Sequence, residues 1–192
     1  TRGFAGTVLW LLIPVGLMIL ASKIAHNAGI LVSILGGLLL MGVLLIIPFQ
    51  QVWFARENRF RAFIEIGPVC RLAGRAPFKF WLALSLTLVM AVPLFLLKIE
   101  LTPAEITWLP ALFFVVFGLP ARLMTGWAIG RAEQREASPN FLLRWFCRVA
   151  ALGLALPFVF GYVVILFFTQ YISWNGTLSL LEQHALLVPS PF

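Results

Sequence analysis

The side chains of this sequence that are suited to chemistry are few and far apart. The imidazoles are His26 and His184, and the thiols are Cys70 and Cys147. A zinc site needs three or four such ligands together, but in the topology inferred below the imidazoles and the thiols lie on opposite membrane faces. We therefore expect no metal site, and no disulfide because both thiols would face a reducing compartment.

Each histidine has two interpretations. His26 lies in a short polar gap between apolar runs, where it is a turn residue, and His184 lies in a polar tail. Alternatively, either one is a single ligand to a pigment at the membrane edge. We favour the first interpretation because no second strong ligand lies near either residue. We predict no cofactor, and we expect bound lipid.

Hydroxyl groups within the apolar runs have no base beside them. The chain contains no Asp, and neither Glu nor His occurs in these runs. A serine nucleophile needs a neighbouring base, and ion-coupled transporters use acidic or histidine side chains within the membrane. We therefore predict no catalytic residue and no enzymatic activity. The hydroxyl residues concerned are Ser33, Ser85, Thr87 and Thr125.

Long apolar runs dominate the chain. Of its 192 residues, 61% are hydrophobic and 11% are charged, whereas soluble domains carry about 25% charged residues. A helix of about 20 residues crosses the hydrocarbon core of a membrane. We predict an all-α transmembrane helix bundle that forms a single domain, residues 1–192. Its five spans are expected at about residues 4–22, 29–49, 80–97, 106–128 and 146–170.

The positive charge gives the bundle an orientation. All of the 14 Lys and Arg residues except Lys23 and Lys98 fall on one side of these spans. Cytoplasmic loops carry such an excess, so we expect the N-terminus in the cytoplasm and the tail, residues 171–192, outside. The net charge of +7 is then a topology signal, and we predict no nucleic-acid partner.

Tryptophans occur near both ends of the predicted spans, where their rings favour the membrane interface. We expect interfacial anchors at Trp53, Trp81, Trp127 and Trp145 on the inner side, and at Trp108 and Trp174 on the outer side. This placement supports the same orientation independently of the charges.

The polar segment of residues 50–79 is predicted to lie along the cytoplasmic membrane surface. Trp53, Phe60 and Phe63 fall on one side of a helix over residues 53–66, and Arg61 points away from it. Such a helix would place its aromatic rings in the acyl boundary. We expect Gly67 and Pro68 to end this helix.

Three small residues in the second run, Gly29, Ser33 and Gly37, recur every four positions. This spacing is typical of a close helix-packing face in membranes, although glycine is also common in such helices. The partner of this face is either another span of the chain or another subunit.

Arg122 is the charge that lies within an apolar run. Its side chain either extends to the cytoplasmic head groups, or contacts a carbonyl or Glu internally, or binds an anionic substrate. Pro120 precedes it and is expected to bend the helix there.

The stretch from Arg56 through Lys98 resembles a bacterial family of multi-pass inner-membrane proteins of unknown function. There, an amphipathic element with paired aromatic and arginine residues likewise precedes a span. The segments LPARLMTGWAIGRA and FFTQYISWNGTLSLLEQHALLVPSPF are similar to the C-terminal half of such proteins. The resemblance implies a bacterial inner-membrane location and a region preceding Thr1. It implies no activity, cofactor or catalytic residue.

These observations favour a non-enzymatic membrane subunit that scaffolds or stabilises a larger membrane complex, with the lipid bilayer and other membrane subunits as partners. They identify no soluble substrate. The alternative is a transporter or permease component that handles a lipid or small molecule. Prolines at Pro14, Pro93, Pro120 and Pro157 would then break helices around a central site.

The topology is testable by thiol labelling. Cys70 should be shielded from a membrane-impermeant thiol reagent applied outside, and a cysteine introduced by Ser179→Cys should react. The reverse pattern would contradict the orientation. An even number of spans would put the two termini on the same face and contradict the span count.

Overall fold

The chain is helical throughout the part that the computed structural model describes, residues 2–24, 26–96, 108–135, 141–172 and 180. These residues form no strand, which confirms the predicted all-α class for them. The elements are α1 (Arg2–Ala21), α2 (His26–Glu57), the 3-10 helix η1 (Phe60–Phe63), α3 (Ile66–Arg75), α4 (Pro77–Leu96), α5 (Trp108–Glu133) and α6 (Phe141–Ile172).

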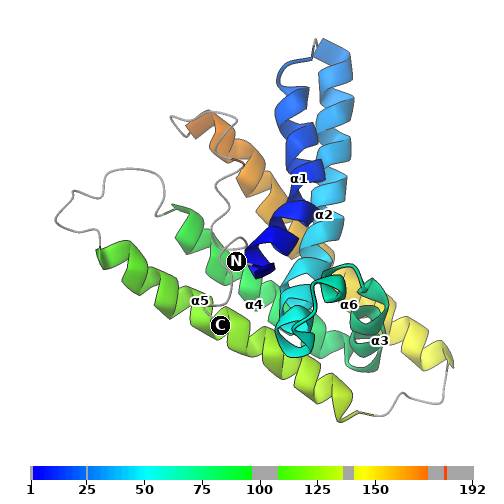
Figure 1. The fold of residues 1–192 in the computed structure, drawn as a ribbon. Helices are drawn as coiled ribbons and strands as arrows, with labels where there is room; N and C mark the ends of the chain where they lie inside the picture. The colour runs from blue at the N-terminus through cyan, green and yellow to red at the C-terminus, as the bar shows by residue number, and fades with distance from the viewer. Residues whose placement is uncertain (1, 25, 97–107, 136–140, 173–179, 181–192) are drawn as a thin grey trace.

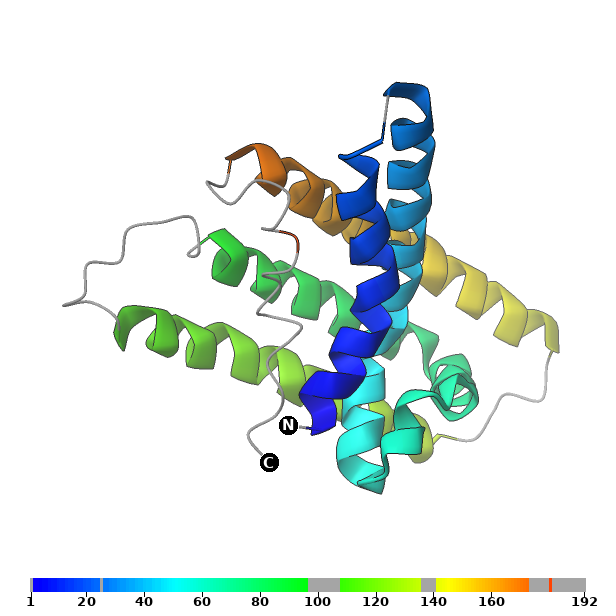
Figure 2. The ribbon, with the colours of Figure 1, turned by 45° about the horizontal axis from the view of Figure 1, so that its top comes forward.

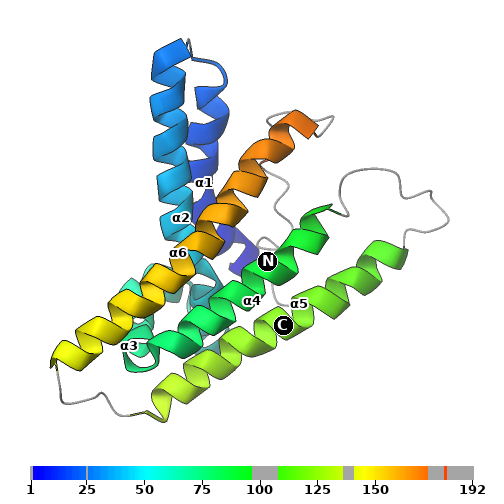
Figure 3. The same cartoon turned by 180° about the vertical axis from the view of Figure 1, so that it is seen from behind.

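The helices form two groups (Figure 1). In the first, α1 and α2 pack as an antiparallel hairpin. In the second, α4 lies between α5 and α6 and packs against both, as the view from behind shows (Figure 3). The half of α2 that ends at Glu57 crosses the second group, while the other half projects away from it with α1.

The charged segments gather at one end of the molecule. There α2 ends, η1 and α3 follow, α4 and α6 begin, and α5 ends (Figure 2). The turn between α1 and α2, which contains Lys23, lies far from this end. The charge pattern of the sequence therefore corresponds to one charged end in space. The Lys and Arg residues of its segments are Arg56, Arg59, Arg61, Arg71, Arg75, Lys79, Arg131, Arg135, Arg144 and Arg148.

Several of the helices suit a membrane. Within the described residues, three stretches are long and apolar enough to cross one: Gly3–Ala21, Ala28–Glu57 and Phe141–Phe168. A fourth results if α3 and α4, which are bent by 111° relative to each other, are counted as one broken span. The five-span count therefore stays a prediction, as does the orientation. The tail, residues 171–192, lies outside the described residues except for the end of α6 and Leu180.

The segment of residues 50–79 differs from the single interfacial helix expected over residues 53–66. Helix α2 continues through Trp53 and ends at Glu57. The next residue, Asn58, has a left-handed φ of 50°. Asparagine tolerates this conformation better than most residues, so it commonly follows a helix. After η1, Gly67 and Pro68 lie in the first turn of α3 instead of ending a helix. Proline fits there because the first N–H groups of a helix have no intrahelical acceptor.

Helix α3 ends at Arg75, two residues before Pro77. The residue before a proline is displaced from helical conformation by the ring, and Ala76 accordingly has φ −138° and ψ 59°. Pro77 then begins α4, a position that its fixed φ favours. The 111° bend between α3 and α4 follows from this break.

Five other prolines of the described residues do not divide the helices that contain them. Each lies inside one continuous helix, which membrane helices accommodate by local adjustment. The transporter alternative expected broken helices at four of these positions, all except Pro48, and the helices are continuous there. These prolines are Pro14 in α1, Pro48 in α2, Pro93 in α4, Pro120 in α5 and Pro157 in α6.

Glycine allows α1 and α2 to approach closely. A Cβ at Gly36 would lie 2.9 Å from Met18 Cγ and 3.0 Å from the Pro14 carbonyl oxygen. Gly29, seven residues earlier and therefore on the same side of α2, would meet the Ala21 carbonyl oxygen at 2.8 Å.

The three predicted packing residues have different surroundings. Gly29 meets the end of α1, Ser33 is half-buried, and Gly37 is in ordinary contact with Val163 of α6. Gly36 is not one of the predicted residues, which recur every four positions. In the middle of the hairpin it nevertheless lies closely against α1.

Alanine at two glycines of α2 tests this packing. Gly36→Ala should destabilise the protein by about 1–3 kcal/mol because its Cβ overlaps α1. Gly42→Ala is the control, since no atom lies within 4 Å of a Cβ there, and it should stabilise the helix by about 0.5–1 kcal/mol. Thermal unfolding in detergent, followed by circular dichroism, measures both. Equal effects of the two variants would contradict the close approach.

Candidate functional site

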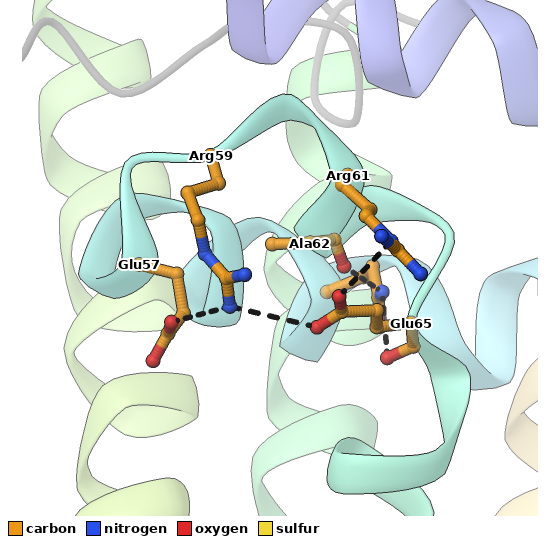
Figure 4. Close-up of polar contacts among 6 residues, drawn as sticks. Glu57, Arg59, Arg61, Ala62 and Glu65 are labelled. Atoms are coloured by element: carbon orange, nitrogen blue, oxygen red, sulfur yellow. Dashed lines mark hydrogen bonds and ion pairs between the residues drawn. The ribbon is translucent and has the colours of Figure 1, made fainter.

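The chain leaves α2 through a corner where backbone carbonyls lie outside regular helix. Buried carbonyls of this kind need donors, and the Gln50 amide supplies two. Its Nε2 donates to the carbonyl oxygen of Ala62 and, at 3.2 Å, to that of Glu65 (Figure 4). The Gln50 side chain is fully buried, so the bond to Ala62 forms away from solvent, and the bond to Glu65 is part-buried. We call residues 50–65 the α2–η1 corner.

Helix α1 holds the same corner from the other side. Trp10 Nε1 donates to the carbonyl oxygen of Phe63 at 2.9 Å. Gln51 Nε2 donates to Thr7 Oγ1 at 2.9 Å, and Thr7 is itself buried between α1 and α2. The donors that satisfy the corner therefore come from both helices of the hairpin, α1 and α2.

The aromatic rings of the corner differ from the predicted anchors. Phe63 was expected at the membrane interface, but its ring is fully buried, with its centroid 4.6 Å from that of Phe54. A Cβ at Gly6 would overlap this ring, so the glycine makes room for it. Phe60 is 44% exposed, and its role as an interfacial anchor stays a prediction.

Ion pairs cover the outer surface of the corner. Arg59 lies between two carboxylates, 2.7 Å from Glu57 and 3.8 Å from Glu65 (Figure 4). Arg61 approaches Glu65 from the other side, at 3.7 Å. Exposed pairs of this kind contribute about 0–1 kcal/mol each, so they orient the side chains more than they stabilise the fold.

A further pair joins the corner to α5. Arg56 forms a salt bridge with Glu133 at the end of α5, and its guanidinium lies 5.7 Å from the centre of the Trp53 ring. Among the described residues, every arginine of the corner therefore has a carboxylate partner.

The predicted tryptophan anchors differ in how far their side chains are exposed. Trp145 is 57% exposed, and Trp127 is exposed beneath Lys79, whose Nζ lies 5.2 Å from the ring centre. Trp53 and Trp81 are half-buried. The side chain of Trp108 and all of Trp174 lie outside the described residues.

Arg122 lies inside α5 and is half-buried. The Thr125 hydroxyl donates to its backbone carbonyl oxygen at 2.8 Å. The three contacts expected for its side chain, with head groups, with an internal carbonyl or Glu, or with an anionic substrate, stay predictions.

The described residues contain no group of three or more His, Cys, Asp or Glu side chains that would hold a metal ion. Cys70 is exposed and Cys147 is half-buried, and no disulfide joins them. His26 begins α2, and His184 lies outside the described residues.

Sequence reasoning missed the three side-chain donors that hold the corner. Gln50 and Gln51 follow an apolar run directly, which is a visible signal, but no sequence pattern identifies the carbonyls that Gln50 reaches or the hydroxyl that Gln51 reaches. Trp10 lies mid-run and has no polar neighbour in sequence.

Comparison with protein-family models, curated proteins and solved structures finds no match to this chain. The family resemblance drawn from the sequence therefore stays a prediction. Chemically, the corner consists of amide, indole and guanidinium donors that bind the chain's own carbonyls and carboxylates. This arrangement fastens helices together.

Substitution of Gln50 tests that fastening. Gln50→Leu removes the donor for the buried Ala62 carbonyl, which costs about 1–3 kcal/mol when left without a partner, and for the part-buried Glu65 carbonyl. Gln50→Glu keeps the shape and should destabilise the protein as well, because an ionised carboxylate cannot donate. Thermal unfolding in detergent measures the loss.

Gln134→Leu is the matched control for this change. Gln134 is exposed near the end of α5, so its substitution should shift stability by no more than about 0.5 kcal/mol. A Gln50→Leu variant as stable as this control would show that the corner does not depend on the amide.

Proposed function

We propose that the protein is a non-enzymatic subunit of the bacterial inner membrane that scaffolds a larger membrane complex. In this proposal the N-terminus is cytoplasmic, the tail is outside, and the chain crosses the membrane five times with bound lipid around it. The partners are transmembrane helices of other subunits.

The observation that carries the proposal is the projecting hairpin. The half of α2 that lies far from the corner projects with α1 away from most of the second helix group (Figure 1), and many of its apolar side chains are exposed. These residues are between 41% and 69% exposed, and they are Ile30, Leu31, Ile34, Leu35, Leu38 and Leu39. A hairpin that stands apart in this way leaves room for helices of another chain beside it.

Exposed glycines add to this surface. Gly16 on α1 and Gly42 on α2 are exposed, and among the described residues nothing beyond the helix's own nearby backbone lies within 4 Å of a Cβ at either position. In lipid, helices associate through close contact at small residues, because the acyl chains are as apolar as the side chains. Such positions allow the backbone of a partner helix to approach.

The transporter alternative receives less support. It depends on helices broken at prolines around a central site, and the described prolines lie inside continuous helices. We therefore keep the scaffold as the proposed function.

Purification from native membranes in mild detergent tests the proposal. The full chain should bring down one or more membrane proteins at a constant ratio. A clean monomer that carries lipid alone would contradict the scaffold role.

A shape change on the hairpin distinguishes a partner from lipid. Gly42→Leu keeps the surface apolar but blocks a close helix approach, so it should abolish co-purification while the protein remains folded. Val115→Leu on an exposed face of α5 is the control and should leave the complex intact. If both variants retain the partner, the hairpin is not its binding surface.

A further inference from the structure

The arginines at the junction of α3 and α6 differ from those of the corner. Arg71 and Arg75 of α3 and Arg148 of α6 are exposed, and no carboxylate of the described residues forms a salt bridge with them. We call these three residues the α3–α6 arginines.

Gly74 places the Arg148 guanidinium against the helix that carries Arg71 and Arg75. Arg71, Gly74 and Arg75 are three and four positions apart, so they share one side of α3. The Arg148 guanidinium lies directly over Gly74, and a Cβ at that position would overlap its Nη2, Cζ and Nε atoms. The cation of α6 is therefore held against α3, beside the two arginines of that helix.

Like charges that share one region of the surface repel each other, and an anion among them offsets that repulsion. Guanidinium groups match the geometry of phosphate oxygens and bind them with paired hydrogen bonds. We propose that the α3–α6 arginines bind the phosphate of an anionic phospholipid head group.

The surface next to the arginines favours a lipid as the source of that phosphate. Leu152 and Leu156 follow Arg148 at intervals of four, so they continue along the same side of α6. Both are exposed, as is Val149. A head group at the guanidinium would thus have apolar side chains beneath it for its acyl chains, which neither a free phosphate nor an acidic peptide needs.

Binding can be measured on the full chain, purified in nonionic detergent and freed of lipid. Native mass spectrometry with added dioleoyl phosphatidylglycerol or dioleoyl phosphatidylcholine gives the affinity for each. The anionic lipid should bind more tightly. Although the site rests on the membrane location proposed above, this measurement uses the isolated chain, so loss of a protein partner would not affect it.

Charge variants locate the site. Arg148→Gln and Arg71→Gln should each weaken phosphatidylglycerol binding about tenfold or more, the effect of losing one charge-assisted contact. Arg135→Gln, at an exposed arginine just after α5, removes the same charge elsewhere and should leave the affinity within about twofold.

A steric pair tests the geometry without a charge change. Gly74→Leu should displace the Arg148 guanidinium and weaken binding as Arg148→Gln does. Gly67→Leu, in the same helix, is the control because nothing lies within 4 Å of a Cβ there. Circular dichroism and elution volume confirm that the variants are folded, and the arginine variants decide the question if Gly74→Leu is not.

Three results would overturn the proposal. The first is equal affinity for the two lipids. The second is a loss of phosphatidylglycerol affinity in a control variant, Arg135→Gln or Gly67→Leu, that is as large as the loss in Arg148→Gln or Gly74→Leu. The third is saturation of the Arg148-dependent site by inorganic phosphate in the absence of lipid, which would identify free phosphate as the ligand.

Discussion

Backbone carbonyls outside a helix need hydrogen-bond donors when they lie away from water. The arrangement of the helices in this protein follows from how the carbonyls of the α2–η1 corner obtain their donors. Between α2 and α3 the chain leaves regular helix for a short 3-10 turn. Gln50 and Trp10 donate to the carbonyls of Ala62, Glu65 and Phe63 there. Because one donor comes from α2 and the other from α1, the same bonds that satisfy the turn also fix the hairpin against it.

The position of α3 depends on this corner, and the charged surface depends on α3. The corner directs the chain into α3, and the break at Ala76 then turns it by 111° into α4. Helix α3 is thereby brought against the start of α6, where Gly74 accommodates the Arg148 guanidinium. The corner arginines have carboxylate partners, whereas the α3–α6 arginines have none among the described residues. Charge of one sign therefore remains uncompensated at one place on the surface.

Glycine and proline act locally in this chain. Gly36, Gly6 and Gly74 each make room for one neighbour: helix α1, the Phe63 ring and the Arg148 guanidinium. Pro77 begins a helix and its predecessor ends one, while the prolines inside α1, α4, α5 and α6 leave those helices continuous. A proline within an apolar run is therefore a poor predictor of a helix break in this chain. A proline that follows an amphipathic segment is a better one, because the residue before it leaves the helical conformation.

Composition and periodicity by themselves determined the all-α class and the existence of the long helices, since apolar runs of this length favour helix wherever water is excluded. They also determined that the positive charges group together, because alternate gaps of an antiparallel bundle meet at one end. Only the tertiary structure decided that Phe63 is buried, that Gly36 lies close against α1 in the middle of the hairpin, and that Gln50 reaches the carbonyls of the corner. The physical reason is distance along the chain: each of these contacts joins residues whose pairing depends on the crossing of helices, and local sequence does not encode that crossing.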